Sequence, residues 1–241
     1  MTGEGSSSAV AVAEPAPGSP PGATPSWAML RALGGIAAIS GLLVVLAYQL
    51  TAPIIAENQR VRTERAVFQV IPGAVAKRDL ALTEQGLLPA GQGAQGETVF
   101  AAYDGTGRLL GVAFPGAAQG YADVIRFLFG YDPGCRCIVG MQVLKSTETP
   151  GLGDKIATDP AFLENFRALD ARLDPSGAQL ANAIATVKHG TKTEPWQIDA
   201  ISGATISSVA TGRALNKAAQ RLVPAVHRSL DVLQSPGEVS P

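Results

Sequence analysis

The sequence predicts an α+β protein with a single N-terminal transmembrane helix, followed by a domain built on a mainly antiparallel, twisted sheet with flanking helices. Three observations lead to this prediction. One apolar run near the N-terminus is long enough to cross a bilayer. The middle of the chain is dominated by strand pairs joined by short turns, and the last helical segment is amphipathic.

The first 27 residues are expected to form a disordered tail. They contain five Pro, four Gly and five Ser but no Lys or Arg, a composition that buries too little apolar surface to offset the entropy of ordering. Because a secretory signal opens with a basic region, the apolar run behind this tail is expected to be a retained anchor rather than a cleaved peptide.

The transmembrane helix is predicted over residues 28–53. The 25 residues from Ala32 to Ala56 carry no formal charge, and about 20 helical residues are enough to span the hydrocarbon core. Trp27 and Tyr48 are candidate interfacial anchors. A buried core helix is the alternative for this segment.

The charges around this helix bear on its orientation. Arg31 stands alone before the uncharged run, whereas a group of basic residues follows it, and that asymmetry favours a cytoplasmic C-terminal domain. The rule weakens where a long domain follows the helix. Residues 54–73 are predicted to be an amphipathic stalk that ends at the breaker pair Pro72-Gly73.

The globular domain is expected over residues 74–233, and residues 234–241 are expected to be a second disordered tail. Residues 84–96 are predicted to be a Gly- and Gln-rich loop, and Asp159 is the expected N-cap of a short helix that begins at Pro160. The expected strands are Glu97–Tyr103, Arg108–Phe114, Val124–Gly130, Cys135–Leu144 and about Ala183–Lys188, and the expected helices are Pro160–Leu169 and Ser207–Leu233.

Composition excludes several classes of function. All basic residues except Arg31 and all acidic residues except Glu4 and Glu14 lie from Glu57 onward, which leaves 18 of each and no basic surface for nucleic acid. The chain has only two cysteines and two histidines, which are few candidate ligands for a zinc, haem or iron–sulfur site. Redox chemistry in this chain would therefore need an organic cofactor.

A dinucleotide fingerprint, G-x-G-x-x-G, occurs at residues 91–96. That motif binds phosphate only where a strand precedes it and a helix follows. Here a predicted strand follows, so we do not expect NAD to bind at this segment.

The segment from Asp199 to Ser208 lies where a short extended piece meets the last helix. Its small residues let a phosphate approach the backbone, and the free N–H groups at a helix start favour an anion. Thr205 is therefore placed where a phosphate could be held or attached. The alternative is that Thr205, Ser207 and Ser208 only cap the helix.

Residues Asp199–Thr205 match in full the motif Asp-x-x-Ser/Thr-Gly-Ala-Thr, and here the chain resembles the membrane-anchored FMN-binding domain proteins. The resemblance implies that a separate flavin transferase, which consumes FAD, esterifies the Thr205 hydroxyl to the phosphate of FMN. A second block, beginning at Glu148, is similar to the Glu-Thr-Pro-Gly-Leu-Gly loop of that family, and Gly120-Tyr121 also matches it. The implied cofactor-binding residues are Thr205, Asp199, Ser202, Gly203, Ala204, Glu148, Thr149, Pro150, Gly151, Leu152 and Gly153, with no catalytic residue and no metal ligand.

Within that family, the anchor, the stalk and both blocks most resemble the G subunit of the Rnf electron-transport complex, over roughly residues 45–220. This resemblance implies that the chain relays electrons through FMN as one subunit of a membrane complex. The complex would couple electron transfer between ferredoxin and NAD to ion translocation, and the chain would not be a complete enzyme by itself. The resemblance also implies a single-pass inner-membrane protein with the flavin domain on the periplasmic side, contrary to the charge count. The alternatives are a C subunit of the sodium-pumping NADH:quinone reductase, a stand-alone flavin carrier, or a membrane-anchored scaffold without flavin.

The remaining candidate residues are interpreted mainly as structural. Cys135 and Cys137 are favoured as two small strand residues, with a redox pair or cluster ligands as the alternative. A disulfide between them would close a tight ring. His189 and His227 are expected to be structural or exposed, and Trp196 is either an aromatic wall for the flavin ring or part of the domain core.

Overall fold

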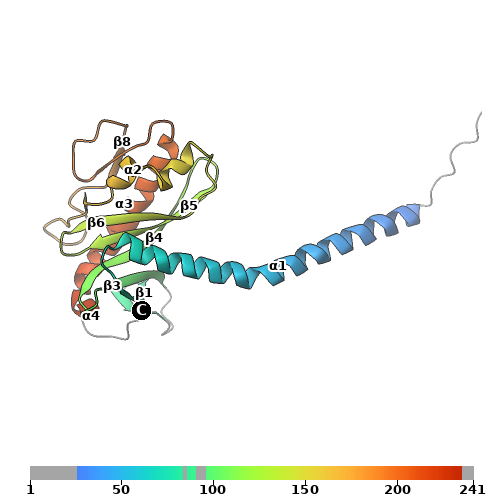
Figure 1. Cartoon of the computed structure of the whole chain (residues 1–241), viewed down its shortest axis with the longest axis horizontal. Helices are drawn as coiled ribbons and strands as arrows, with labels where there is room; N and C mark the ends of the chain where they lie inside the picture. The colour runs from blue at the N-terminus through green and yellow to red at the C-terminus, as the bar shows by residue number, and fades with distance from the viewer. Residues whose placement is uncertain (1–25, 84–85, 91–95, 235–241) are drawn as a thin grey trace, which may run out of the picture. The chain divides into compact units, whose positions relative to one another are not determined.

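Figure 1 shows the computed structural model, which describes residues 26–83, 86–90 and 96–234. Helix α1 (Ser26–Val70) runs without interruption for 45 residues. Its most apolar window has a mean hydropathy of 2.1 and is fully exposed, so its length and composition suit a membrane span, as predicted. Ser26 and Trp27, expected in the tail, already belong to α1, and residues 1–25 lie outside the described chain.

The chain divides into two compact units, one ending at Ile55 and one beginning at Ala56. The second unit is built on a seven-stranded sheet with the order β2-β1-β3-β4-β5-β6-β7, in which every neighbouring pair is antiparallel. This arrangement confirms the predicted fold class. The strands are β1 (Ala76–Thr83), β2 (Gly86–Pro89), β3 (Glu97–Tyr103), β4 (Leu109–Gln119), β5 (Val124–Asp132), β6 (Cys137–Lys145) and β7 (Leu169–Asp170).

Successive side chains of β3 face two different hydrophobic cores, because side chains alternate between the faces of a sheet. Val99 and Ala101 belong to the larger core, which helix α3 (Thr205–Arg228) covers (Figure 1). Phe100 and Ala102 belong to a smaller core that is closed by the C-terminal end of α1. The α1 backbone approaches the sheet so closely that only glycine fits opposite it: a β-carbon on Gly140 would lie 2.5 Å from the carbonyl oxygen of Val70.

The remaining elements connect the sheet to α3. They are the 3-10 helix η1 (Gly153–Ala157), helix α2 (Pro160–Glu164), the parallel pair β8 (Ala185–Val187) and β9 (Gln197–Asp199), and the terminal helix α4 (Leu230–Gln234). The Asp159 carboxylate accepts hydrogen bonds from the N–H groups of Ala161 and Phe162, which confirms Asp159 as the N-cap of α2.

Several predicted boundaries were wrong. The loop expected over residues 84–96 contains β2, and β1 was not predicted because a buried charge breaks its alternation: Lys77 is only 7% exposed, with its ammonium 2.7 Å from Asp79 Oδ1. Helix α2 ends at Glu164 instead of about Leu169, because the Asn165 amide donates to the carbonyl of Phe162 in the last turn.

The C-terminal helix was also predicted imperfectly. It breaks at Ser229, whose hydroxyl accepts a hydrogen bond from the Leu87 N–H of β2, and it resumes as α4. Gln234, expected in the tail, ends α4, and residues 235–241 lie outside the described chain. Residues 91–95 of the dinucleotide fingerprint also lie outside it, and β3, not a helix, follows Gly96, as expected.

Candidate functional site

The predicted attachment residue, Thr205, is the first residue of α3 and is exposed. The N-cap position is Ala204, whose methyl side chain cannot accept a hydrogen bond. The first hydrogen bond of the helix runs from Ser208 N to Ala204 O, so within the described chain the N–H groups of Thr205, Ile206 and Ser207 have no acceptor. The helix start is therefore open to an anion.

The alternative in which Thr205, Ser207 and Ser208 cap this helix is wrong. The Ser207 hydroxyl donates to the carboxylate of Glu148, and the Ser208 hydroxyl donates to the carbonyl of Ala204 at 2.9 Å. No side chain accepts from the N-terminal N–H groups of α3 within the described residues.

The loop that leads into Thr205 is held by hydrogen bonds to the side chains of Ser208 and His189. Ser208 Oγ, which is fully buried, accepts a hydrogen bond from Ile201 N at 3.1 Å in addition to its bond to Ala204. His189 Nδ1 lies 2.9 Å from the carbonyl oxygen of Ala200. Gly203 has a φ of 83°, a left-handed conformation that a residue without a β-carbon adopts readily. These contacts position the loop without using the N–H groups of Thr205, Ile206 and Ser207.

Asp199, the first residue of the motif, acts on this loop and not on the cavity. Its Oδ1 accepts from Gly190 N at 2.7 Å, and its Oδ2 lies 3.4 Å from His189 Nδ1. The side chain of Asn165, only 6% exposed, hydrogen bonds to both the N–H and the carbonyl of Asp199, at 3.0 and 3.3 Å, as a neighbouring strand would. Lys192 Nζ donates to Asn165 Oδ1 at 3.0 Å. Asn165 was missed because no local motif marks it; only the fold brings α2 to β9.

Glu148 is the buried carboxylate of the site and is 6% exposed. It accepts hydrogen bonds from Ser207 Oγ at 2.5 Å, from Ala122 N at 3.0 Å and from Tyr121 N at 3.2 Å. Burial raises the pKa of Glu148, but the hydrogen bonds from Ser207 and from the backbone N–H groups outweigh burial, so its pKa lies below the ordinary value of 4.5. The carboxylate is therefore charged at neutral pH and joins three segments of the chain.

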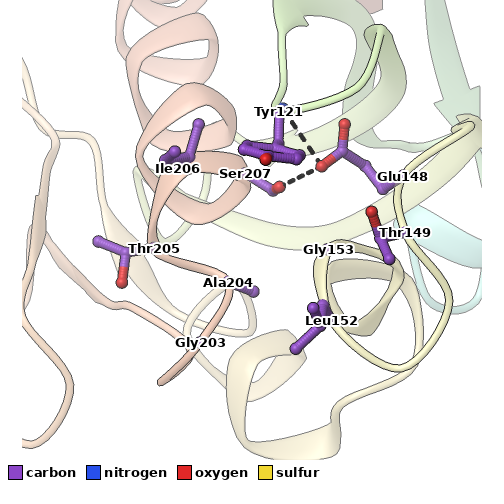
Figure 2. A pocket seen from close by; sticks show the side chains of 10 residues that line it. All are labelled: Tyr121, Glu148, Thr149, Leu152, Gly153, Gly203, Ala204, Thr205, Ile206 and Ser207. Carbon is purple, nitrogen blue, oxygen red and sulfur yellow. Dashed lines mark hydrogen bonds between the residues drawn. The ribbon is translucent and has the colours of Figure 1, made fainter.

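A cavity of about 450 Å³ opens beside the start of α3 (Figure 2). Its volume lies within the range of small-molecule sites. Thr205 lies on one side of the opening, and Glu148 and Thr149 lie on the other. The lining residues are Tyr121, Glu148, Thr149, Leu152, Gly153, Gly203, Ala204, Thr205, Ile206 and Ser207.

Seven of the eleven residues named for cofactor binding thus line one cavity, although they come from two blocks about fifty residues apart in the sequence. Pro150 and Gly151 belong to the same loop but do not line it. Asp199 and Ser202 line a separate hollow of about 180 Å³, together with His189.

Three exposed apolar side chains surround the opening. Tyr121, Ile206 and Leu152 are 70%, 57% and 49% exposed. Trp196, considered as an aromatic wall, is half-buried and does not line this cavity; the aromatic residue there is Tyr121. An apolar rim, an open helix N-terminus and a cavity of this size fit the flat ring and the phosphate of FMN.

The cysteines and one histidine differ from expectation. Cys135 and Cys137 form a disulfide, and only Cys137 belongs to a strand, so the interpretation as two small strand residues is wrong for Cys135. Cys135 lies in the turn before β6, which brings the two sulfur atoms together. His189 is exposed as expected, but it has a charged partner in Asp199. No group of side chains in the described chain is arranged to hold a metal ion.

Comparison with known proteins agrees with this geometry. Residues 120–220 match the family model of the FMN-binding domain. The chain is 30% identical over 183 residues to the G subunit of the ion-translocating oxidoreductase complex of Methanosarcina acetivorans, covering 76% of this chain and 87% of that protein. It is 35% identical over 124 residues to the protein of that name from Cereibacter sphaeroides, covering 52% of this chain and 55% of that one.

The solved structure of NqrC from Shewanella oneidensis superimposes with a TM-score of 0.55 at 21% identity, covering 75% of this chain and all of that one. The C subunit of the Na(+)-translocating NADH-quinone reductase from Parabacteroides distasonis gives 0.53 at 20% identity, covering 75% and 96%. These two likenesses show the shared fold. The match to the Methanosarcina protein over most of its length shows the family: the chain belongs to the G subunits of ion-translocating oxidoreductase complexes, and it contains an FMN-binding domain.

Proposed function

We propose that this chain is an electron-transfer subunit that carries FMN bonded covalently to Thr205, in a membrane complex that couples ferredoxin and NAD to ion translocation. The observation that carries the proposal is the position of Thr205. This residue is exposed, is the first residue of α3 and lines the cavity, and the three N–H groups at that helix start have no acceptor in the described chain. The names of the relatives, which are subunits of such complexes, support the partners.

Attachment requires a modifying enzyme, and a flavin transferase that consumes FAD is the proposed partner. Thr205 Oγ1 would lose its proton and form a phosphoester bond, while the bond between the two phosphates of FAD breaks and AMP leaves. The open N–H groups of Thr205, Ile206 and Ser207 would then hold the phosphate oxygens. The start of α3 would thus bind the phosphate and carry its covalent bond.

The cavity supplies the environment of the ring. Flavin accepts and donates electrons one or two at a time, and the protein sets its position and its surroundings. The apolar side chains of Tyr121, Leu152 and Ile206 would exclude water at the rim, and Glu148 places a buried negative charge at the wall. The contacts of Glu148 with two other segments, one at Tyr121 and Ala122 and one at Ser207, would keep that geometry fixed during electron transfer.

We further propose that α1 anchors the domain in the cell membrane and that the domain lies on the periplasmic side. The disulfide between Cys135 and Cys137 supports this side, because disulfides persist in oxidising compartments. The basic residues that follow the helix favour the opposite side, but long domains translocate largely regardless of such charges. Protease added to intact spheroplasts should degrade the domain; full protection would place it in the cytoplasm.

Covalent loading is tested by in-gel flavin fluorescence of the denatured full chain after co-expression with a flavin transferase. Thr205→Ala should remove the fluorescence, and Thr205→Ser, which keeps a hydroxyl at the helix start, should retain part of it. Thr149→Ala is the matched control, since Thr149 lines the same cavity without standing at the helix start. Fluorescence that persists in Thr205→Ala would refute the attachment site, and a dark wild-type chain would favour the scaffold alternative.

A further inference from the structure

The disulfide between Cys135 and Cys137 crosses the turn that joins β5 to β6, with the two Cα atoms 5.3 Å apart. The two halves of the bond differ in accessibility. Cys135 is exposed in the turn, whereas Cys137, at the start of β6, is only 8% exposed. One cysteine is therefore accessible to a reagent in solution, and the other is held inside the fold.

This disulfide contributes little to holding the chain together. It links residues only two positions apart, and the loop-closure entropy that a disulfide removes from the unfolded chain is smallest for short loops. The hairpin is already closed by the pairing of Asp132 with Cys137 and of Tyr131 with Ile138. Stability of the fold therefore does not account for the bond.

The residue between the cysteines favours exchange of the bond. Arg136 has a φ of 57° and is the one non-glycine residue with a positive φ in the described parts of the chain. A left-handed conformation is disfavoured for a residue with a β-carbon, and here it belongs to the turn, where the Arg136 carbonyl accepts a hydrogen bond from Ala171 N at 3.1 Å. Its positive charge also lies next to both sulfur atoms in sequence, and a neighbouring cation stabilises a thiolate. The nearby Asp132 carboxylate is engaged by Gly134 N at 2.6 Å.

The disulfide is remote from the cofactor cavity. Tyr121 and Ala122, which contact Glu148, come just before β5, whereas the cysteines follow its end. A strand of nine residues extends roughly 26 Å. A partner of the disulfide must therefore come from solution and not from the cavity.

We propose that Cys135 and Cys137 form a thiol-exchange site on the domain surface, whose partners are thiols such as glutathione or the exposed cysteine of a thiol–disulfide oxidoreductase. An incoming thiolate attacks Cys135 Sγ, the bond between the two cysteines breaks, and Cys137 leaves as a thiolate. A second partner thiolate then attacks the partner's sulfur in the mixed disulfide, the bond to Cys135 Sγ breaks, and Cys135 leaves as a thiolate while the two partners depart joined as a disulfide. The pair gains two electrons and two protons, and two partner thiols become one disulfide.

The full chain provides a direct readout, because trypsin cleaves between the two cysteines at Arg136. After equilibration in glutathione buffers of graded ratio and quenching with an alkylating reagent, the oxidised form yields peptides 127–136 and 137–145 still linked. The reduced form yields the same peptides separated and alkylated. We expect reversible conversion between the two forms, with thermal unfolding of the domain almost unchanged. A bond that yields to glutathione only after the domain unfolds would overturn the proposal.

Two single variants test the asymmetry of the site. In Cys137→Ser the exposed Cys135 has no resolving partner and should accumulate a glutathione mixed disulfide. In Cys135→Ser the remaining, buried Cys137 should react with glutathione at a rate at least roughly tenfold lower. Circular dichroism of both variants checks that the domain is folded. Equal rates in two folded variants would contradict attack at Cys135.

Discussion

Replacing Glu148 by glutamine should destabilise the domain even though it changes little in shape. The two carboxylate oxygens accept from three donors, and two of these, Tyr121 N and Ala122 N, are backbone groups that bond to different oxygens. Glutamine has one carbonyl oxygen, so its NH₂ group must face one of the two N–H groups. An N–H group that loses its acceptor in this part-buried contact costs about 1–3 kcal/mol.

In a domain of this size, a loss of about 2 kcal/mol in the free energy of unfolding lowers the melting temperature by roughly 4–8 °C. Thermal unfolding of the full chain in detergent, followed by circular dichroism, measures it. Glu164→Gln is the matched control: the Glu164 side chain is 61% exposed and pairs with Arg167 at 3.0 Å, so its loss should cost less than about 1 kcal/mol.

The effect should also depend on pH in a definite direction. The pKa of Glu148 is lower in the folded chain than its ordinary value of 4.5, so folding favours the charged form. Its contribution to stability is present above the unfolded pKa and is lost as the pH falls through the folded pKa. The gap between wild type and Glu148→Gln should therefore be full at pH 7 and shrink below pH 4.5. A variant within about 0.5 kcal/mol of wild type at pH 7, with an unchanged pH profile, would refute the role assigned to Glu148.

Three other substitutions test the site. Gly153→Ala should destabilise the domain by about 1–3 kcal/mol, because a β-carbon there collides with the Glu148 carboxylate. In the control Gly105→Ala, the nearest atom to the added β-carbon lies 4.0 Å away, so the free energy of unfolding should change little. Equal effects of the two substitutions would contradict the packing around Gly153. Asn165→Asp cannot donate to the carbonyl of Asp199 and should slow covalent flavin loading in a time course with the transferase; an unchanged rate would show that this clamp is dispensable. Ser208→Ala leaves Ile201 N unpaired and should lower stability by about 1–3 kcal/mol in denaturant unfolding, and unfolding like wild type would contradict that bond's importance.

The sequence was informative wherever a local pattern determined the structure. The apolar run of α1, the turn between β3 and β4 and the N-cap at Asp159 each depend on residues close together in the chain, and each was predicted. The two motif blocks were found as separate segments. Their meeting at one cavity depends on how the sheet presents Glu148 to Ser207, which sequence spacing does not reveal.

What the sequence concealed depends on long-range contacts. Strand β1 was not predicted because the burial of Lys77 depends on a partner charge and on the ring of Phe100, whose centroid lies 5.5 Å from the ammonium. Asn165 has no local signal, since its partners lie 34 residues away at Asp199. The spacing of the two cysteines predicts a tight ring on a strand, but placing Cys135 in a turn makes the link possible.

The central claim is that Thr205 carries the cofactor, and mass spectrometry of the chain co-expressed with a flavin transferase tests it most directly. The intact mass should rise by one FMN minus one water. Trypsin releases Thr205 within residues 193–213, so fragmentation of that peptide should place the added mass on Thr205. An unmodified chain, produced beside a transferase that is active on another substrate, would contradict the account.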